Sequence, residues 1–161
     1  MLTCARLREV LHYDRDTGLF TWIKTPRTSP RKPGDIAGGP HDQGYWHIRI
    51  DYTAHKAHRL AWLYVTGEWP AGVIDHKDGD PGNNRFDNLR DVTDRINSEN
   101  QKRSHCDTRS GLLGATPNHH RWMAQISSRG KYHYLGTFDT PELAHGAYVA
   151  AKRDLHSGCL L

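Results

Sequence analysis

The polar segment from residue 102 to residue 110, KRSHCDTRS, constrains the fold of this chain more than any other feature of its sequence. It contains no large apolar side chain, so we expect a solvated linker rather than part of a core. The chain has 161 residues, which is enough for one ordinary domain or for two to three small modules. A linker at this place favours small modules, each with its own modest core.

The first 54 residues alternate short apolar runs with turn residues. Residues 3–12 have helical spacing, and residues 19–23 follow a turn and have the composition of a short strand. Residues 24–44 are rich in Pro, Arg, Gly and Lys, as in a solvated loop, and residues 45–52 alternate like a second strand. The sequence therefore predicts a short helix followed by a β-rich region.

The middle of the chain changes from an apolar helix to a pair of strands. Residues 58–66, HRLAWLYVT, have the pattern of a helix that is stopped by Gly67. Residues 72–76 and 88–93 have the composition of strands joined by a loop of Asp, Gly and Asn, and a short helix starts near Asp94. The predicted order is helix, strand, loop, strand, helix.

Asp75 and His76 stand together at the end of the first of these strands. Hydrolysis of a phosphodiester needs a nucleophilic water, a base to take its proton, and positive charge near the phosphate. A carboxylate can hold a metal ion and an imidazole can act as the base. Asn97, on the short helix, is the candidate second metal ligand, and Asn88 is the candidate group that orients His76. Such a hard, oxygen-rich and incomplete donor set favours Mg²⁺ or a similar ion.

The same segments have plainer interpretations. The Asp-His dipeptide alone is common, and residues 78–83 can be an ordinary turn or a weak calcium loop. Calcium is disfavoured because the EF-hand spacing and its terminal glutamate are missing. His55 and His58 fit a surface residue and a helix-entry residue better than zinc ligands, while a phosphate contact by His58 or Arg59 stays open. The three cysteines are too far apart in sequence for a four-thiolate zinc site, and they argue against a disulfide framework.

Together these residues resemble the HNH motif of phage free-standing and intron-encoded homing endonucleases. The resemblance covers about residues 55–101 and rests on His58-Arg59-Leu60-Ala61, Asp75-His-Lys-Asp-Gly79, Asn83-Asn84, Asn88-Leu89-Arg90, Val92-Thr93, Ile96-Asn97 and Glu99-Asn100. It implies a ββα-metal fold in which Asp75 and Asn97 bind one divalent ion. His76 would be the general base, and Asn88 would hold it. The final asparagine, in place of a histidine, implies Mg²⁺ or Mn²⁺ rather than Zn²⁺, and the products would carry 5′-phosphate and 3′-hydroxyl ends.

After the linker, the sequence predicts three strands and a helix. We expect strands at residues 113–116, 121–128 and 131–138, with Arg129-Gly130 as a tight hairpin between the last two. Thr140-Pro141-Glu142 opens a helix in the favoured order of cap, proline and acid. The module is therefore expected to be a small sheet covered by one helix.

The two faces of the second of these strands differ in character. Trp122, Ala124 and Ile126 share the face that suits the alanine-rich helix. The opposite face, which carries Arg121 and Gln125, is left open. An open sheet face with arginine, glutamine and nearby aromatic side chains can enter a DNA major groove.

Most of residues 110–158 is similar to the APETALA-type (ethylene-response-factor) DNA-binding domain. The similarity rests on Gly114, Arg121-Trp-Met-Ala-Gln-Ile126, Tyr134-Leu-Gly-Thr-Phe-Asp139 and residues 144–151. It implies that these side chains face the duplex: Thr116, Arg121, Gln125, Ser127, Tyr132 and Tyr134. Several of these positions carry Ser or Tyr where the family favours arginine or tryptophan, which implies weaker or different specificity. Arg129 and Lys131 are expected to contact phosphate, with solvated surface charge as the alternative.

We therefore predict an α+β protein in three parts. They are a helix and β-rich region at residues 1–54, a ββα-metal HNH core at 55–103, and a linker with the DNA-binding sheet and helix at 104–161. The net charge of +4 favours a polyanionic partner. We expect a monomer that binds duplex DNA and nicks it, without an obligate protein partner. No apolar run is long enough to span a membrane, and we expect a cytoplasmic protein encoded by a phage or mobile element.

Two other functions stay open from the sequence. A DNA-binding regulator with a catalytically silent HNH segment would share the same fold, although the complete set of Asp75, His76, Asn88 and Asn97 argues against it. Cleavage of RNA is the second alternative, because the same chemistry hydrolyses either backbone. Plasmid DNA and structured RNA as substrates would separate these functions.

Overall fold

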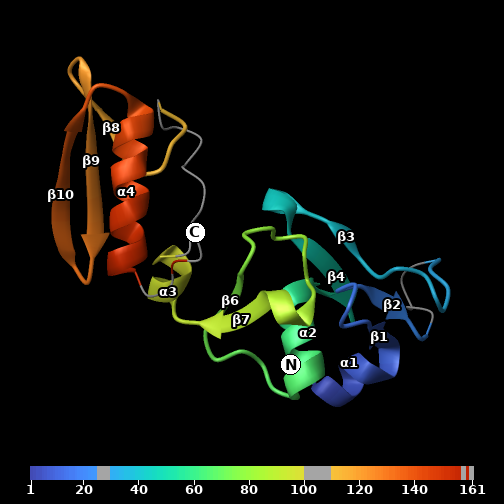
Figure 1. The fold of residues 1–161 in the computed structure, drawn as a ribbon. Helices are drawn as coiled ribbons and strands as arrows, with labels where there is room; N and C mark the ends of the chain where they lie inside the picture. The colour runs from blue at the N-terminus through green and yellow to red at the C-terminus, as the bar shows by residue number, and fades with distance from the viewer. Residues whose placement is uncertain (25–29, 100–109, 157–158, 160–161) are drawn as a thin grey trace. The chain divides into compact units, whose positions relative to one another are not determined.

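The computed structural model describes the chain except for residues 25–29, 100–109, 157–158 and 160–161. The described residues form an α+β structure with small antiparallel sheets and four α-helices, as the sequence predicts (Figure 1). They divide into two compact units, residues 1–93 and residues 94–161, each with its own apolar cluster. The predicted boundaries after residues 54 and 103 stay predictions. Apart from Ser110, the predicted linker lies outside the described residues.

The first unit begins with a helix and two small sheets. Helix α1 (Cys4–Val10) leads into β1 (Leu11–Tyr13), which pairs with β2 (Phe20–Trp22). The second sheet has the order β3 (Gly39–Pro40), β4 (Trp46–Ile50) and β5 (Thr53–Lys56), and a short 3-10 turn, η1, spans Asp42–Gly44. The sequence predicts a single strand over residues 45–52. A hairpin forms instead, because Asp51 and Tyr52 adopt φ angles of +47° and +68° at the turn.

Helix α2 (Ala57–Thr66) connects these sheets to the rest of the unit. It ends where the sequence predicts, at Gly67, which has a φ of +87° and donates its N–H to the carbonyl of Leu63. The helix contacts α1, β4 and β5. Its apolar side of Leu60, Ala61 and Leu63 joins a core to which the N-terminal helix and the strands also contribute.

The last part of the first unit is a two-stranded ribbon, β6 (Val73–His76) and β7 (Leu89–Val92), as predicted. The carboxylate of Asp91 accepts hydrogen bonds from the N–H groups of Ala71 and Gly72, at 2.8 and 2.9 Å, and fixes the entry to β6. Residues 77–88 connect the two strands and include a 3-10 turn, η2 (Phe86–Asn88). The polar loop predicted from the sequence therefore starts directly after His76.

The second unit contains α3 (Asp94–Glu99), the strands β8 (Ala115–Asn118), β9 (Arg121–Ser128) and β10 (Lys131–Phe138), and α4 (Pro141–Leu155). The sheet has the order β10-β9-β8, and α4 lies along one of its faces (Figure 1). Strand β8 starts two residues later than predicted, after Gly114, whose hypothetical β-carbon would lie 2.0 Å from the Tyr148 ring. In the described residues no helix is long and apolar enough to cross a bilayer.

Candidate active site

Asp75 is a buried carboxylate near the end of β6. Its side chain is 9% exposed, and it lies opposite Arg90 of β7 in the strand register. The Nε and Nη2 atoms of Arg90 lie 2.8 and 2.7 Å from Oδ2 of Asp75. Arg90 therefore compensates the charge of the buried carboxylate and fixes its direction through charge-assisted hydrogen bonds.

His76 follows Asp75 and is also buried, at 6% exposure. Burial lowers the pKa of its imidazole, and the side chain of Asn84 acts as a hydrogen-bond acceptor that opposes this fall. His76 is thus neutral at physiological pH. A neutral imidazole is the form that can take a proton from a water molecule.

A second imidazole stands beside His76. His58, near the start of α2, has its ring centroid 5.1 Å from that of His76, and the two rings are nearly perpendicular. Tyr45 contacts both histidines, at 5.3 and 6.2 Å between ring centroids. Burial, and then the nearby His76, lower the pKa of His58 to about 3. His58 is only 4% exposed, and the phosphate contact predicted for it stays a prediction.

Asn88 closes the loop that follows His76. Its Nδ2 donates to Oδ1 of Asp78 at 3.0 Å and to the carbonyl of Asn83 at 2.9 Å, while its Oδ1 accepts from the N–H of Asp78 at 3.1 Å. These bonds tie the loop to the start of β7. The direct contact with His76 that the sequence analysis assigns to Asn88 stays a prediction.

Asn84, in the same loop, is a buried amide for which the sequence predicts no separate role. It is 4% exposed, and its Nδ2 donates to the carbonyl of Gly82 at 3.1 Å. The hydroxyl of Tyr13 donates to the Asn84 carbonyl at 2.6 Å. Nothing in the sequence distinguishes Asn84 from the adjacent Asn83, because only the folded chain shows which amide is buried.

The donor types present suit a hard divalent ion. The described residues contain no cluster of three or more His, Cys, Asp or Glu side chains arranged to hold a metal. Mg²⁺ does not need such a cluster, because one or two carboxylates hold it together with water and substrate phosphate. The Asp75 carboxylate, next to a neutral imidazole, fits this requirement. Asn97, the predicted second ligand, is exposed on α3 in the second unit.

Arg59, the other residue predicted to meet phosphate from α2, is half-buried. Its Nη1 donates to the carbonyl of Gly72 at 3.5 Å, and its guanidinium carbon lies 5.8 Å from the centre of the Trp69 ring. Arg59 thus contacts the residue just before β6. The predicted contact with DNA is not tested by these interactions.

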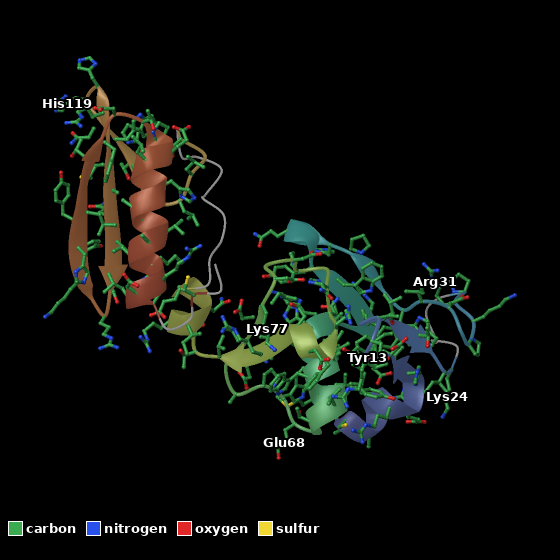
Figure 2. All side chains as sticks on the ribbon, viewed as in Figure 1. Tyr13, Lys24, Arg31, Glu68, Lys77 and His119 are labelled. Atoms are coloured by element: carbon green, nitrogen blue, oxygen red, sulfur yellow. The ribbon has the colours of Figure 1, made fainter. Side chains whose placement is uncertain are left out.

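The residues predicted to face DNA from the second unit share the sheet face opposite α4. Tyr132 pairs with Ser127 and Tyr134 with Gln125 across β9 and β10, and all four side chains are exposed. The other predicted contacts are exposed as well, and they are Thr116, Arg121, Arg129 and Lys131. Arg121 forms an ion pair with Asp139 at 2.9 Å. Figure 2 labels His119, in the turn between β8 and β9 at one end of this sheet.

Comparison with known proteins places the ribbon and its buried Asp-His pair in a defined class. Residues 55–99 match the model of a family described as HNH endonuclease, so the chain carries an HNH endonuclease domain. The chain belongs to the family of Protein 3.8 of Escherichia phage T7, with which it is 35% identical over 108 residues, covering 65% of this chain and 88% of that protein. HNH endonucleases typically use a divalent metal ion.

A second relative is the DNA endonuclease I-HmuI of Bacillus phage SP01. It is 47% identical over 47 residues, which are 29% of this chain. The match spans only 27% of the length of I-HmuI. The likeness therefore concerns a segment of about the size of the HNH domain.

Proposed function

We propose that this chain is a metal-dependent endonuclease that hydrolyses phosphodiester bonds of duplex DNA, with His76 as the general base. The observation that carries the proposal is the adjacent, buried pair of Asp75 and His76 at the end of β6, inside the segment that matches the HNH family. Similarity to a phage DNA endonuclease supports DNA as the substrate. A homing-type activity is part of the same proposal.

In this mechanism His76 accepts the proton of the attacking water. Burial keeps the pKa of His76 below its ordinary value, so the imidazole is ready to act at neutral pH. Arg90 holds Oδ2 of Asp75 and fixes the carboxylate beside the base. Asp75 and Asn97 would hold Mg²⁺ or Mn²⁺, whose charge stabilises the transition state and the leaving oxygen. Asn88 secures the loop after His76 through Asp78.

Binding of the duplex is assigned to the open face of the second sheet, as in the ethylene-response-factor type of domain. Exposed side chains on paired strands support this assignment, with Gln125 and Tyr134 as direct neighbours. Arg129 and Lys131, at the hairpin, would contact phosphates, as would His58 and Arg59 of the first unit. One catalytic site in a monomer leads us to expect a nick rather than a double-strand break.

Supercoiled plasmid incubated with Mg²⁺ tests the catalytic proposal. The wild-type protein should convert it to the nicked form, and His76→Ala should abolish conversion while DNA affinity changes by less than about threefold. His12→Ala, which removes an exposed histidine of β1, is the matched control and should cleave normally. Full activity of His76→Ala would remove His76 as the base. Structured RNA under the same conditions tests RNA cleavage.

Two further experiments address the metal and the second unit. Asp75→Ala and Asn97→Ala should each weaken the binding of Mn²⁺ measured by calorimetry, since each removes an oxygen ligand. Deletion of residues 105–161 should reduce DNA affinity or change site choice before it reduces the rate of chemistry. An unchanged target preference in the deletion variant would contradict the role given to the sheet face.

A DNA-binding regulator with a silent HNH domain is the second candidate. One observation favours this candidate: two nitrogens of Arg90 already bind Oδ2 of Asp75, the proposed metal ligand. Such a protein would bind duplex DNA with nanomolar to micromolar affinity and leave plasmid intact with any divalent metal. Cleavage by the wild-type protein that is lost in His76→Ala decides against it.

A further inference from the structure

The hairpin of β4 and β5 in the first unit has one buried face and one open face. The two isoleucines of β4 are buried in the core. Side chains alternate along a strand, so His47 and Arg49 of β4 lie on the opposite face. On β5, Lys56 lies directly opposite His47, and Ala54 directly opposite Arg49. These four residues form the open β4–β5 face, which contains no acidic residue.

The open β4–β5 face carries two cations that are available to a ligand. Arg49 and Lys56 are exposed, and within the described part of the chain neither forms an ion pair with a carboxylate. By contrast, Arg6 and Lys24 of the same unit are paired with Glu9, at 2.9 and 2.7 Å. Positive charge that no neighbouring carboxylate compensates attracts a polyanion such as a phosphate backbone.

Two stacked imidazoles extend this face beyond β4. The rings of His41 and His47 are nearly parallel, with 4° between their planes and 4.5 Å between their centroids. His41 follows β3 directly and is exposed. Each imidazole carries at least one N–H group, and N–H donors bind phosphate oxygens.

Lys56 is held next to the proposed active site. Its ammonium nitrogen lies 4.4 Å from the centre of the Tyr45 ring, in a cation–π contact. The same ring contacts His58 and His76, at 5.3 and 6.2 Å between ring centroids. Tyr45 is therefore a shared neighbour of the exposed cation and of the proposed base. One DNA strand carries a phosphate for about every 3.4 Å of helix axis, so a strand with one phosphate at His76 has others near Lys56.

We propose that the open β4–β5 face binds the phosphate backbone of duplex DNA beside the bond that is hydrolysed at His76. Arg49 and Lys56 each contact a phosphate, and the stacked imidazoles donate to phosphate oxygens. Tyr45 orients Lys56 toward the strand that enters the site. This surface belongs to the first unit and is separate from the sheet of the second unit. The placement beside the cleaved bond rests on the proposed function, whereas binding of the backbone does not depend on catalysis.

The salt dependence of DNA binding tests this inference without any chemistry. The full-length protein is titrated into a short fluorescent DNA duplex in EDTA, and anisotropy gives the affinity at several salt concentrations. Each phosphate contact contributes about 0.9 to the slope of log affinity against log salt concentration. Arg49→Gln and Lys56→Gln should each lower this slope by about 0.9 and weaken binding about eightfold at about 0.1 M salt. Lys56→Arg keeps the charge and should retain the wild-type slope.

Lys24→Gln is the matched control. It also removes one positive charge from an exposed side chain of the first unit, but from a lysine that is already paired with Glu9. Its slope should equal that of the wild type. Wild-type slopes in both Arg49→Gln and Lys56→Gln would overturn the proposal. An equal decrease in Lys24→Gln would also overturn it, because the effect would then follow net charge rather than this face. Slopes that fall with an RNA duplex but not with DNA would assign the face to RNA instead.

The placement beside the cleaved bond needs a second measurement. A photo-crosslinker attached to Ala54→Cys, in a chain whose three natural cysteines are replaced by serine, marks the DNA that lies on this face. Crosslinks should fall within about one helical turn, or about 10 base pairs, of the mapped cleavage site. Crosslinks only at greater distances would refute the placement.

The outcomes separate this inference from the proposed function. A protein that cleaves plasmid, but whose slopes are unchanged in Arg49→Gln and Lys56→Gln, keeps the proposed function and loses this inference. A protein that never cleaves, but whose slopes fall in these two variants, keeps the DNA-binding face and loses both the nuclease function and the placement beside a cleaved bond.

Discussion

The buried imidazole of His58 should make the first unit sensitive to acid. Its pKa is about 3 in the folded protein against an ordinary value of 6.5, so the unfolded chain binds the proton first as the pH falls. The stability that neutral His58 contributes is complete above pH 6.5 and is lost between pH 6.5 and pH 3. Replacement of His58 by glutamine removes this proton-binding site while keeping a polar side chain.

The magnitude follows from the two pKa values. At pH 5 an unfolded histidine is almost fully protonated, whereas buried His58 is still neutral. Lowering the pH from 7 to 5 should therefore cost the wild-type protein about 2 kcal/mol through His58 alone. This value depends mainly on the unfolded-state pKa, because the folded-state pKa lies well below both conditions. In His58→Gln the loss over the same interval should be smaller by about that amount.

Urea unfolding at the two pH values measures this difference. Tryptophan fluorescence follows the first unit in a Trp122→Phe background, because the other four of the five tryptophans lie in residues 1–93. His12→Gln, which removes an exposed histidine of β1, is the control and should lose as much stability as the wild type. If His58→Gln loses that much as well, His58 is not buried in its neutral form and the packing described around His76 is wrong.

Three substitutions test other contacts. Gly18→Ala should destabilise the first unit by about 2–4 kcal/mol in urea unfolding, because a side chain at a φ of +74° would also meet backbone atoms at 2.5 Å. Gly114→Ala should destabilise the second unit, because the added β-carbon would overlap the Tyr148 ring. Trp122 fluorescence measures this loss, and an effect confined to the first unit would contradict the prediction. Arg90→Leu should cost about 3 kcal/mol, because it removes the cation that compensates the buried Asp75 carboxylate. Adding Asp75→Asn to Arg90→Leu should restore part of the loss, and no recovery would refute the charge argument.

The elements around the site could be predicted from the sequence because their signals are local. The periodicity of residues 58–66, with Gly67 behind it, predicts α2 and its end. The apolar run before Asp75 predicts β6, and the residue types of the Asp-His pair indicate its chemistry. In the second unit, alternation along β9 correctly separates the face under α4 from the open face.

The parts that the sequence does not predict depend on contacts between distant residues. Tyr13 and Asn84 are 71 positions apart, and no local pattern marks either as a partner of the other. The ion pair of Asp75 with Arg90 follows from the register of β6 and β7, which only the folded ribbon defines. The hairpin of β4 and β5 is missed because Tyr52, unlike Asp51, is not one of the residues that usually adopt a left-handed turn conformation.

The apolar cluster of the first unit limits how this protein can be divided into fragments. Leu7, Leu11 and Phe20 of the N-terminal segment share one core with Leu60 of α2 and Leu89 of β7. A fragment cut to the family-matched residues 55–99 would lack more than half of the described residues of that core and would expose the others to water. The smallest fragment that keeps the Asp-His ribbon folded is therefore expected to begin at α1. A graft of this ribbon onto another protein would need to include the β1–β2 hairpin.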